Sequence, residues 1–161
     1  MQHSEQYSQA YMVHKDQFTI KAPPNVIWPL LIEFERFNQT FDRVEVIAGR
    51  RDEVGSVSLL VKQQGEWYMP PYLVKIIKII PERQIVWKMF PVEGSSFMAF
   101  VEFSLVPEGA QTRFLCDVYT EAIVPRMADA SLRELEAKMA ADYEKLGNHI
   151  FPILKRLAES V

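Results

Sequence analysis

A long amphipathic helix over residues 130–161 is the clearest periodic signal in the chain. Apolar side chains recur there every three or four positions, which places them on one helix face. They are Leu132, Leu135, Met139, Tyr143, Leu146, Ile150, Leu154 and Leu157. Gly147 and Pro152 interrupt this pattern. Because proline removes a backbone donor, we expect the last third of the helix to be weakened or kinked.

The first forty residues predict a strand followed by a helical segment. Residues 1–10 are polar and are expected to form a flexible tail. Apolar and polar side chains alternate over residues 16–22, as in a half-buried strand. Helical spacing follows over residues 26–37. Pro29 lies inside it, so we expect a bent or split helix that ends near Phe41.

Between residues 44 and 124 the pattern changes to strands separated by turn signals. The turns fall at residues 48–55, 63–65, 81–83, 91–95 and 107–111, which leaves about six strands. Their connections are too short for parallel crossovers, so the strands form an antiparallel meander. With the first strand, this predicts an α+β domain over residues 11–161, built from a sheet of about seven strands and a long C-terminal helix.

Strand parity predicts which side chains face that helix, since alternate residues on a strand point to opposite faces. Charged residues mark the solvent side. The inward set is Val57, Leu59, Val61, Ile85, Trp87, Met89, Phe97, Ala99, Val101, Phe103, Leu105, Phe114, Cys116, Val118, Thr120 and Ala122. The outward set contains the apolar residues Leu60, Val86, Phe90, Met98, Phe100, Leu115 and Tyr119. Lys75 and Lys78 have opposite parity, so one points inward unless a bulge intervenes.

The amino-acid composition argues against several classes of binding partner. The 161 residues carry a formal net charge of -3 with no basic run, which argues against nucleic acid. One cysteine excludes an internal disulfide, and three widely spaced histidines form no zinc-ligand pattern. No signal peptide or membrane span is recognisable, so we expect a cytoplasmic protein with no metal and no cofactor.

The order of elements and several short motifs resemble one known superfamily. The motifs are Phe18-Thr-Ile-Lys-Ala-Pro-Pro24, Val26-Ile-Trp28, Phe34-Glu35-x-Phe37, Val54-Gly55-Ser56-Val57 and Val106-Pro-Glu-Gly109. They resemble the START-related, birch-pollen-allergen-like (SRPBCC) superfamily, and within it the polyketide cyclase/dehydrase-like group. The resemblance covers residues 16–158. It implies a helix-grip fold, in which a curved antiparallel sheet wraps around the C-terminal helix and leaves a cavity between them.

The inward residues are therefore the candidates for the cavity wall. An aromatic and proline-rich segment around Trp67 and Tyr72 is expected to form one lip of the opening. Tyr143 is the best polar contact, and His149 lies on the flank of the helix. The predicted ligand-binding residues are Trp67, Tyr72, Trp87, Met89, Phe97, Ala99, Val101, Phe103, Phe114, Val118, Thr120, Met139, Tyr143, Leu146 and His149.

Three functions fit these patterns. The first is binding or carriage of an apolar small molecule, such as a lipid, an isoprenoid or an aromatic polyketide-like compound. The second is a cofactor-independent cyclase, aromatase or lyase that uses Tyr143, His149 and one of Lys75 or Lys78. No nucleophile elbow, paired-histidine motif or phosphate loop is present, so the chain is expected to be a binder rather than an enzyme. The third is a protein-interaction module, such as a homodimer formed through the outer sheet face.

Overall fold

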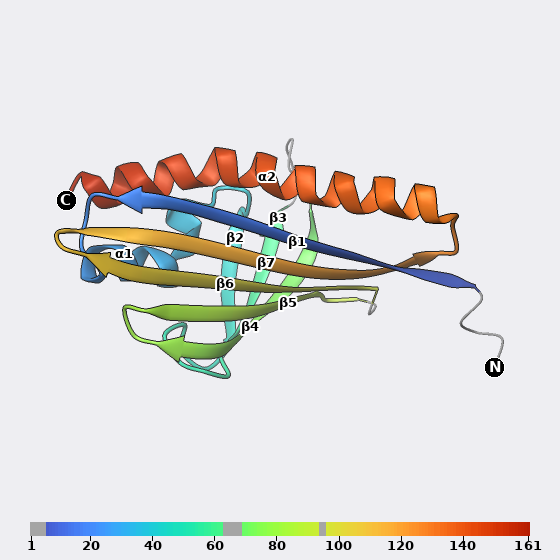
Figure 1. The fold of residues 1–161 in the computed structure, drawn as a ribbon. Coiled ribbons are helices and arrows are strands. Elements are labelled where there is room, and N and C mark those ends of the chain that lie inside the picture. Colours follow the sequence, from blue (N-terminus) through green and yellow to red (C-terminus); the bar gives the residue numbers. More distant parts are fainter. Residues whose placement is uncertain (1–5, 63–68, 94–95) are drawn as a thin grey trace.

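The computed structural model describes residues 6–62, 69–93 and 96–161. Over these residues the chain forms one antiparallel sheet in the order β1-β7-β6-β5-β4-β3-β2, with α2 lying across it (Figure 1). The α+β helix-grip fold is therefore confirmed. The elements are β1 (Tyr7–Ile20), α1 (Pro24–Ile32), η2 (Phe34–Arg36), β2 (Arg43–Ala48), β3 (Val57–Lys62), β4 (Met69–Ile80), β5 (Gln84–Pro91), β6 (Phe97–Glu108), β7 (Gln111–Pro125) and α2 (Asp129–Glu159).

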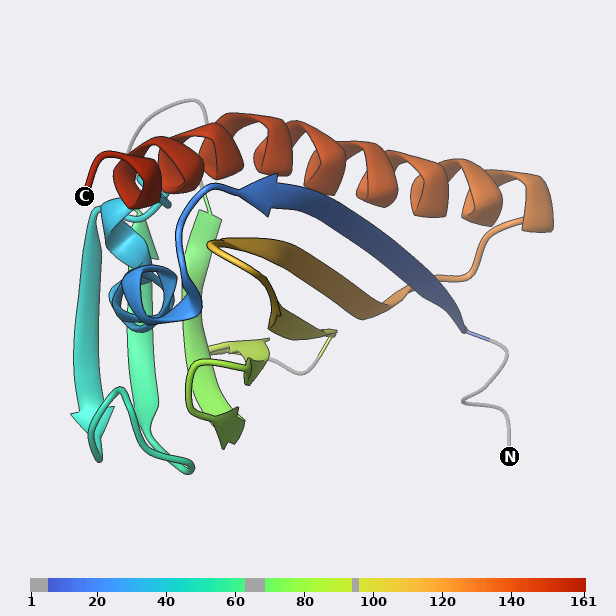
Figure 2. The same cartoon turned by 60° about the vertical axis from the view of Figure 1, so that its left-hand side comes forward.

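Strand β1 begins at Tyr7, much earlier than the sequence pattern predicted, and takes up residues 7–10 of the expected tail. It pairs with β7 along its whole length, from Tyr7 opposite Pro125 to Ile20 opposite Thr112. Ala10 and Met12 are buried, so the strand is anchored by side chains as well as by its ladder. In two views β1 runs alongside α2 (Figures 1 and 2).

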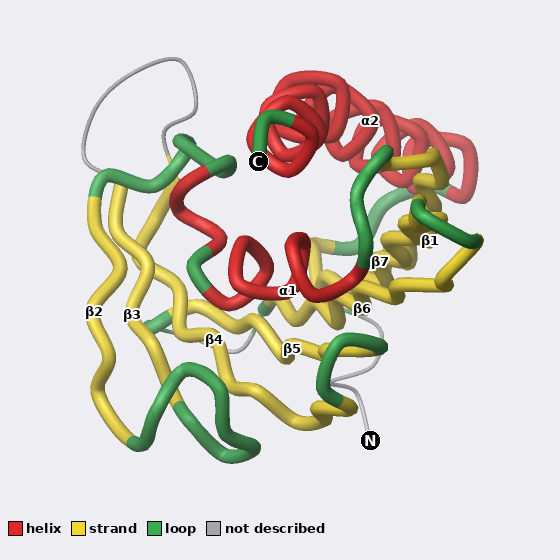
Figure 3. Tube along the Cα trace, turned by 90° about the vertical axis from the view of Figure 1, so that its left-hand side faces the viewer, coloured by secondary structure: helices red, strands yellow, loops and turns green. Residues whose placement is uncertain are grey.

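The first helical segment is split, as Pro29 suggested. Helix α1 contains Pro29 and continues past it to Ile32, where the Glu33 N–H donates to the Pro29 carbonyl. The chain then leaves helical geometry at Glu33 and resumes as the short 3-10 helix η2. This segment ends at Arg36 rather than near Phe41. Seen end-on, α1 lies inside the curve of the sheet, on the same side as α2 (Figure 3).

Helix α2 runs from Asp129 to Glu159 without interruption, so Gly147 and Pro152 do not divide it. Pro152 is exposed, which leaves the carbonyl one turn earlier open to hydration. The buried residues of α2 all lie in its C-terminal half. They are Gly147, Ile150, Phe151, Leu154 and Ala158. The apolar residues before Gly147 are only partly buried, so the helix packs tightly at one end alone.

The predicted parity agrees with burial on β5, β6 and β7, where alternate residues are buried. On β3 it was wrong. Leu60, assigned to the outer face, is 1% exposed, whereas Val57 and Leu59 are half-buried. The β3–β4 register shifts between Leu60 and Lys62, so counting back from Lys62 exchanged the two faces.

A second register shift decides the orientation of the two β4 lysines. It lies between Ile76 and Lys78 in the pairing of β4 with β5. Val74 and Ile76 are buried, while Lys75 and Lys78 are both exposed. The bulge that the sequence left open is confirmed, and neither lysine faces the helix.

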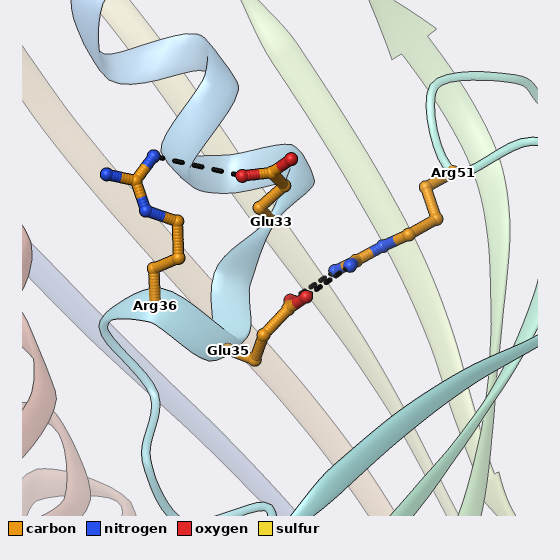
Figure 4. A network of polar contacts seen from close by, with 4 residues as sticks. All are labelled: Glu33, Glu35, Arg36 and Arg51. Atoms are coloured by element: carbon orange, nitrogen blue, oxygen red, sulfur yellow. Dashed lines mark hydrogen bonds and ion pairs between the residues drawn. The ribbon is translucent and has the colours of Figure 1, made fainter.

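An ion pair joins η2 to the loop between β2 and β3 (Figure 4). The Arg51 guanidinium donates two hydrogen bonds to the Glu35 carboxylate, at 2.5 and 2.6 Å, and lies 5.0 Å from the centre of the Phe34 ring. Burial opposes ionisation of Glu35, but the hydrogen bonds from Arg51, a backbone hydrogen bond and the charges of Arg51 and Arg36 together outweigh it, so the pKa of this carboxyl is lowered. The pair fixes the short helix that precedes the Asn38–Phe41 wall of the cavity described below.

Candidate functional site

A cavity of about 510 Å³ lies between the sheet and α2. Its volume falls within the roughly 300–1,000 Å³ typical of small-molecule sites. The wall is drawn from six strands, the segment after η2 and the middle of α2. Its residues are His14, Asp16, Asn38, Thr40, Phe41, Leu60, Tyr72, Trp87, Met89, Phe97, Val101, Phe103, Cys116, Val118, Met139, Asp142, Tyr143, Lys145, Leu146, Gly147, Ile150 and Phe151. Asp142 and Lys145 are exposed, so the cavity reaches the surface beside α2.

Most of the predicted ligand-binding residues line this cavity. They are Tyr72, Trp87, Met89, Phe97, Val101, Phe103, Val118, Met139, Tyr143 and Leu146. Ala99, Phe114 and Thr120 are buried on the same sheet face but behind the lining. His149 is exposed and does not line the cavity. Trp67 lies outside the described residues.

The greater part of the wall is aromatic and aliphatic. The rings of Trp87 and Phe103 meet edge to face at 5.0 Å between centroids, and Tyr72 lies 5.6 Å from Phe97. Val101 and Val118 are directly opposite each other on β6 and β7 and form part of the floor. Such a surface favours an apolar ligand, because aromatic side chains offer large apolar contact areas.

Polar side chains gather where β1 approaches α2. His14 and Asp16 both project from β1 into the lining, with side chains 16% and 24% exposed. The His14 Nε2 atom lies 3.2 Å from Asp16 Oδ2. Burial raises the pKa of the Asp16 carboxyl more than His14 lowers it, and the charge of Glu144 on α2 raises it further. The cavity thus holds a carboxyl group that is costly to ionise.

Gly147 makes room for this carboxyl. A Cβ atom at Gly147 would lie 2.9 Å from Asp16 Oδ2 and 3.2 Å from the Phe151 ring. A glycine inside a helix costs about 1 kcal/mol relative to alanine. The sequence pattern predicted that Gly147 weakens the helix, and the structure shows that its missing side chain leaves space for the Asp16 carboxyl.

Two hydroxyl groups complete the polar side. The Thr120 hydroxyl donates to the Tyr143 hydroxyl oxygen at 3.4 Å, which leaves the Tyr143 proton for another acceptor. Burial raises the pKa of Tyr143, and also that of Tyr72, so both remain neutral phenols near pH 7. Burial, with smaller effects from Asp16 and Asp117, raises the pKa of the Cys116 thiol well above its usual range. Cys116 is therefore not an activated nucleophile.

Sequence reasoning missed His14 and Asp16. The alternation of the strand could have located them. Every second residue from Ala10 to Ile20 points to the same sheet face, and this row includes His14 and Asp16. The strand was taken to begin at Asp16, so this inward row was cut short. Asp142 and Lys145 were also missed, since they flank the apolar face of α2 rather than interrupting it.

The described residues hold no group of three or more histidine, cysteine, aspartate or glutamate side chains placed to bind a metal. Within the same residues, no helix has the length and apolar character required to cross a membrane.

Comparison with solved structures places the chain among proteins of one fold. Norcoclaurine synthase from Thalictrum flavum, in complex with dopamine and hydroxybenzaldehyde, matches with a TM-score of 0.65 and 16% identity over 93% of this chain and 87% of that one. An aromatase/cyclase from a Streptomyces species matches with a TM-score of 0.65 and 17% identity over 94% of each chain. A Staphylococcus aureus protein of unknown function matches with a TM-score of 0.71 and 12% identity over 95% of this chain and 96% of that one.

No protein-family model and no curated protein sequence matches the chain. At identities this low the structural matches establish the fold, which is the helix-grip fold of the START-related, birch-pollen-allergen-like proteins. The function has to be argued from the cavity.

Replacing Asp16 by asparagine is expected to stabilise the protein at pH 8, with a rise in Tm on the order of 2 °C. The folded pKa of Asp16 is raised, so the cost of its charge is absent below its unfolded pKa of about 3.9 and grows as pH rises through the folded value. The difference in Tm should therefore shrink towards pH 4, as followed by circular dichroism. Asp117→Asn, on the opposite face of the sheet, controls for the loss of one negative charge. A variant destabilised equally at pH 4 and pH 8 would contradict this account.

Proposed function

We propose that this protein binds an apolar small molecule in the cavity between the sheet and α2. The observation that carries the proposal is a space of about 510 Å³ with an aromatic and aliphatic wall in an otherwise buried core. Protein interiors are packed to about the density of organic crystals, so an unfilled apolar volume of this size needs a reason. A bound ligand supplies it, since each Å² of apolar surface removed from water contributes about 25 cal/mol.

The wall favours a compound with at least one aromatic ring and few polar groups. Trp87, Phe97 and Phe103 supply ring contacts. The polar groups lie where β1 meets α2 and, at Asn38 and Thr40, on the segment after η2. Two proteins of the same fold support this class of ligand. Norcoclaurine synthase has been solved with dopamine and hydroxybenzaldehyde, both aromatic, and another is an aromatase/cyclase. Lipids and isoprenoids share the apolar requirement but make less use of these rings.

The proposal has three further parts. The protein is located in the cytoplasm, it binds no nucleic acid, and it forms a homodimer through the outer sheet face. Support for the homodimer comes from the outer face. There Tyr11 and Val13 are 44% and 59% exposed, and Tyr11 lies 6.4 Å from the ring of Tyr119. An apolar face of this kind is stabilised when a second copy covers it. Size-exclusion chromatography is expected to show a dimer, and a monomer at high protein concentration would contradict it.

Replacing Val101 or Val118 by tryptophan is expected to weaken binding of an apolar fluorescent probe, N-phenyl-1-naphthylamine, by at least about tenfold, or roughly 1.4 kcal/mol. Both valines form the cavity floor, so an indole there occupies the ligand's space. Probe fluorescence gives the Kd, and circular dichroism shows whether each variant is folded.

The matched control is Tyr119→Trp, next to Val118 in sequence but on the outer face of β7. It should leave the Kd unchanged. A folded Val101→Trp or Val118→Trp variant with wild-type affinity would show that the probe binds elsewhere and would overturn the proposed site.

A further inference from the structure

The polar side of the cavity contains an arrangement that binding alone does not require. His14 and Asp16 come from one strand, and Tyr143 comes from the helix above it. A carboxyl group and an imidazole are costly to remove from water and add nothing to an apolar binding surface. Titratable groups held in a cleft against such a cost are candidates for chemistry.

The first step concerns the pair formed by His14 and Asp16. The Nε2 atom of His14 is buried and lies 3.2 Å from Asp16 Oδ2, without an aligned hydrogen bond to that oxygen or to another described residue. The pair therefore lies on the cavity wall with hydrogen-bonding capacity that the described residues do not use. A carboxylate at this distance stabilises the positive charge that forms when the imidazole takes up a proton.

The second step concerns the position of Asp16. Its carboxyl oxygen occupies the space that a side chain at Gly147 would need. An alanine at residue 147 would favour the helix, yet it would push the carboxyl away from its present place. Gly147 is thus a positioning residue for the Asp16 carboxyl, and through it for His14.

The third step concerns the hydrogen-bond donor. Tyr143 accepts its bond from Thr120, so its own proton is left for an acceptor in the cavity. A neutral phenol on the wall is suited to a carbonyl oxygen that gains negative charge. A base and a donor on the wall of one cavity match the requirements of proton removal next to a carbonyl group.

We infer that the cavity is an active site for proton transfer at the carbon next to the carbonyl group of an apolar aromatic ketone, with His14 as the base and Tyr143 as the donor to the carbonyl oxygen. This inference rests on the proposed function, because the ketone must first bind in the cavity. His14 takes the proton as the C–H bond breaks. The electron pair forms a carbon–carbon double bond, and the charge on oxygen is stabilised by Tyr143. The imidazolium then returns the proton to the same carbon, or to another carbon of a conjugated ketone, which gives net isomerisation.

Hydrogen–deuterium exchange in D₂O tests the step without knowledge of the natural substrate. The probes are 2-tetralone, 2-indanone and phenylacetone, and proton NMR follows loss of the signal from the carbons beside the carbonyl. The protein is expected to accelerate exchange of at least one ketone over buffer. His14→Gln should lower kcat at least about 100-fold, the contribution typical of a general base. Tyr143→Phe is the second variant, should His14→Gln not fold, and is expected to lower kcat about tenfold or more.

Asp16→Asn and Gly147→Ala separate positioning from binding. Each should lower kcat for exchange while KM stays within about twofold, because the ketone still contacts the unchanged apolar wall. A merely structural role would instead change both constants or the fold. His149→Gln is the matched control, since His149 is exposed and outside the cavity lining, and its exchange rate should equal that of the wild type.

The outcomes distinguish this inference from the proposed function. Ketones that bind, as shown by intrinsic tryptophan fluorescence, but exchange no faster than in buffer would overturn the chemistry and leave the binding site intact. Exchange that survives both His14→Gln and Tyr143→Phe would overturn the assigned residues. If no ketone binds, the substrate class is wrong, and the apolar probe then decides separately whether the cavity binds ligands at all.

Discussion

The packing of the C-terminal half of α2 against the sheet is the contact on which the rest of the structure depends. Phe151 lies 5.5 Å from Phe18 and 5.3 Å from Phe114, and Leu154 beside it is fully buried. This cluster joins the helix to β1 and β7. The α2 residues before this cluster are only partly buried, and the cavity lies between them and the sheet.

The same geometry explains why the polar groups lie where they do. Strand β1 follows α2 (Figure 1), so its inward side chains lie beside the helix at the edge of the cavity. His14 and Asp16 are therefore held between two backbones, with Gly147 providing the clearance that the Asp16 carboxyl needs. A site built on a strand and a helix is held more rigidly than one built on loops. The cost is a buried carboxyl group with a raised pKa, a feature more typical of functional sites than of cores.

Much of this arrangement could be predicted from the sequence, and the failures have physical causes. Strand parity located Trp87, Val101 and Val118 because β5, β6 and β7 are regular over these residues. It misplaced Leu60 because a register shift in β3 breaks the alternation. The sequence of a single strand does not show where such a bulge lies, so the residues beyond it are assigned to the wrong face. His14 and Asp16 were lost because polar residues in an inward row resemble the end of a strand. The clearance at Gly147 is a distance between two chain segments, which no local pattern contains.

Binding inside the cavity can be observed directly by NMR on protein with labelled valine and methionine methyl groups and a saturating amount of 2-tetralone. Nuclear Overhauser contacts from the ligand to Val101, Val118 and Met139, with none to the exposed Val13, are the expected result. Contacts confined to Val13 on the outer face, or no contacts at saturation, would contradict the account.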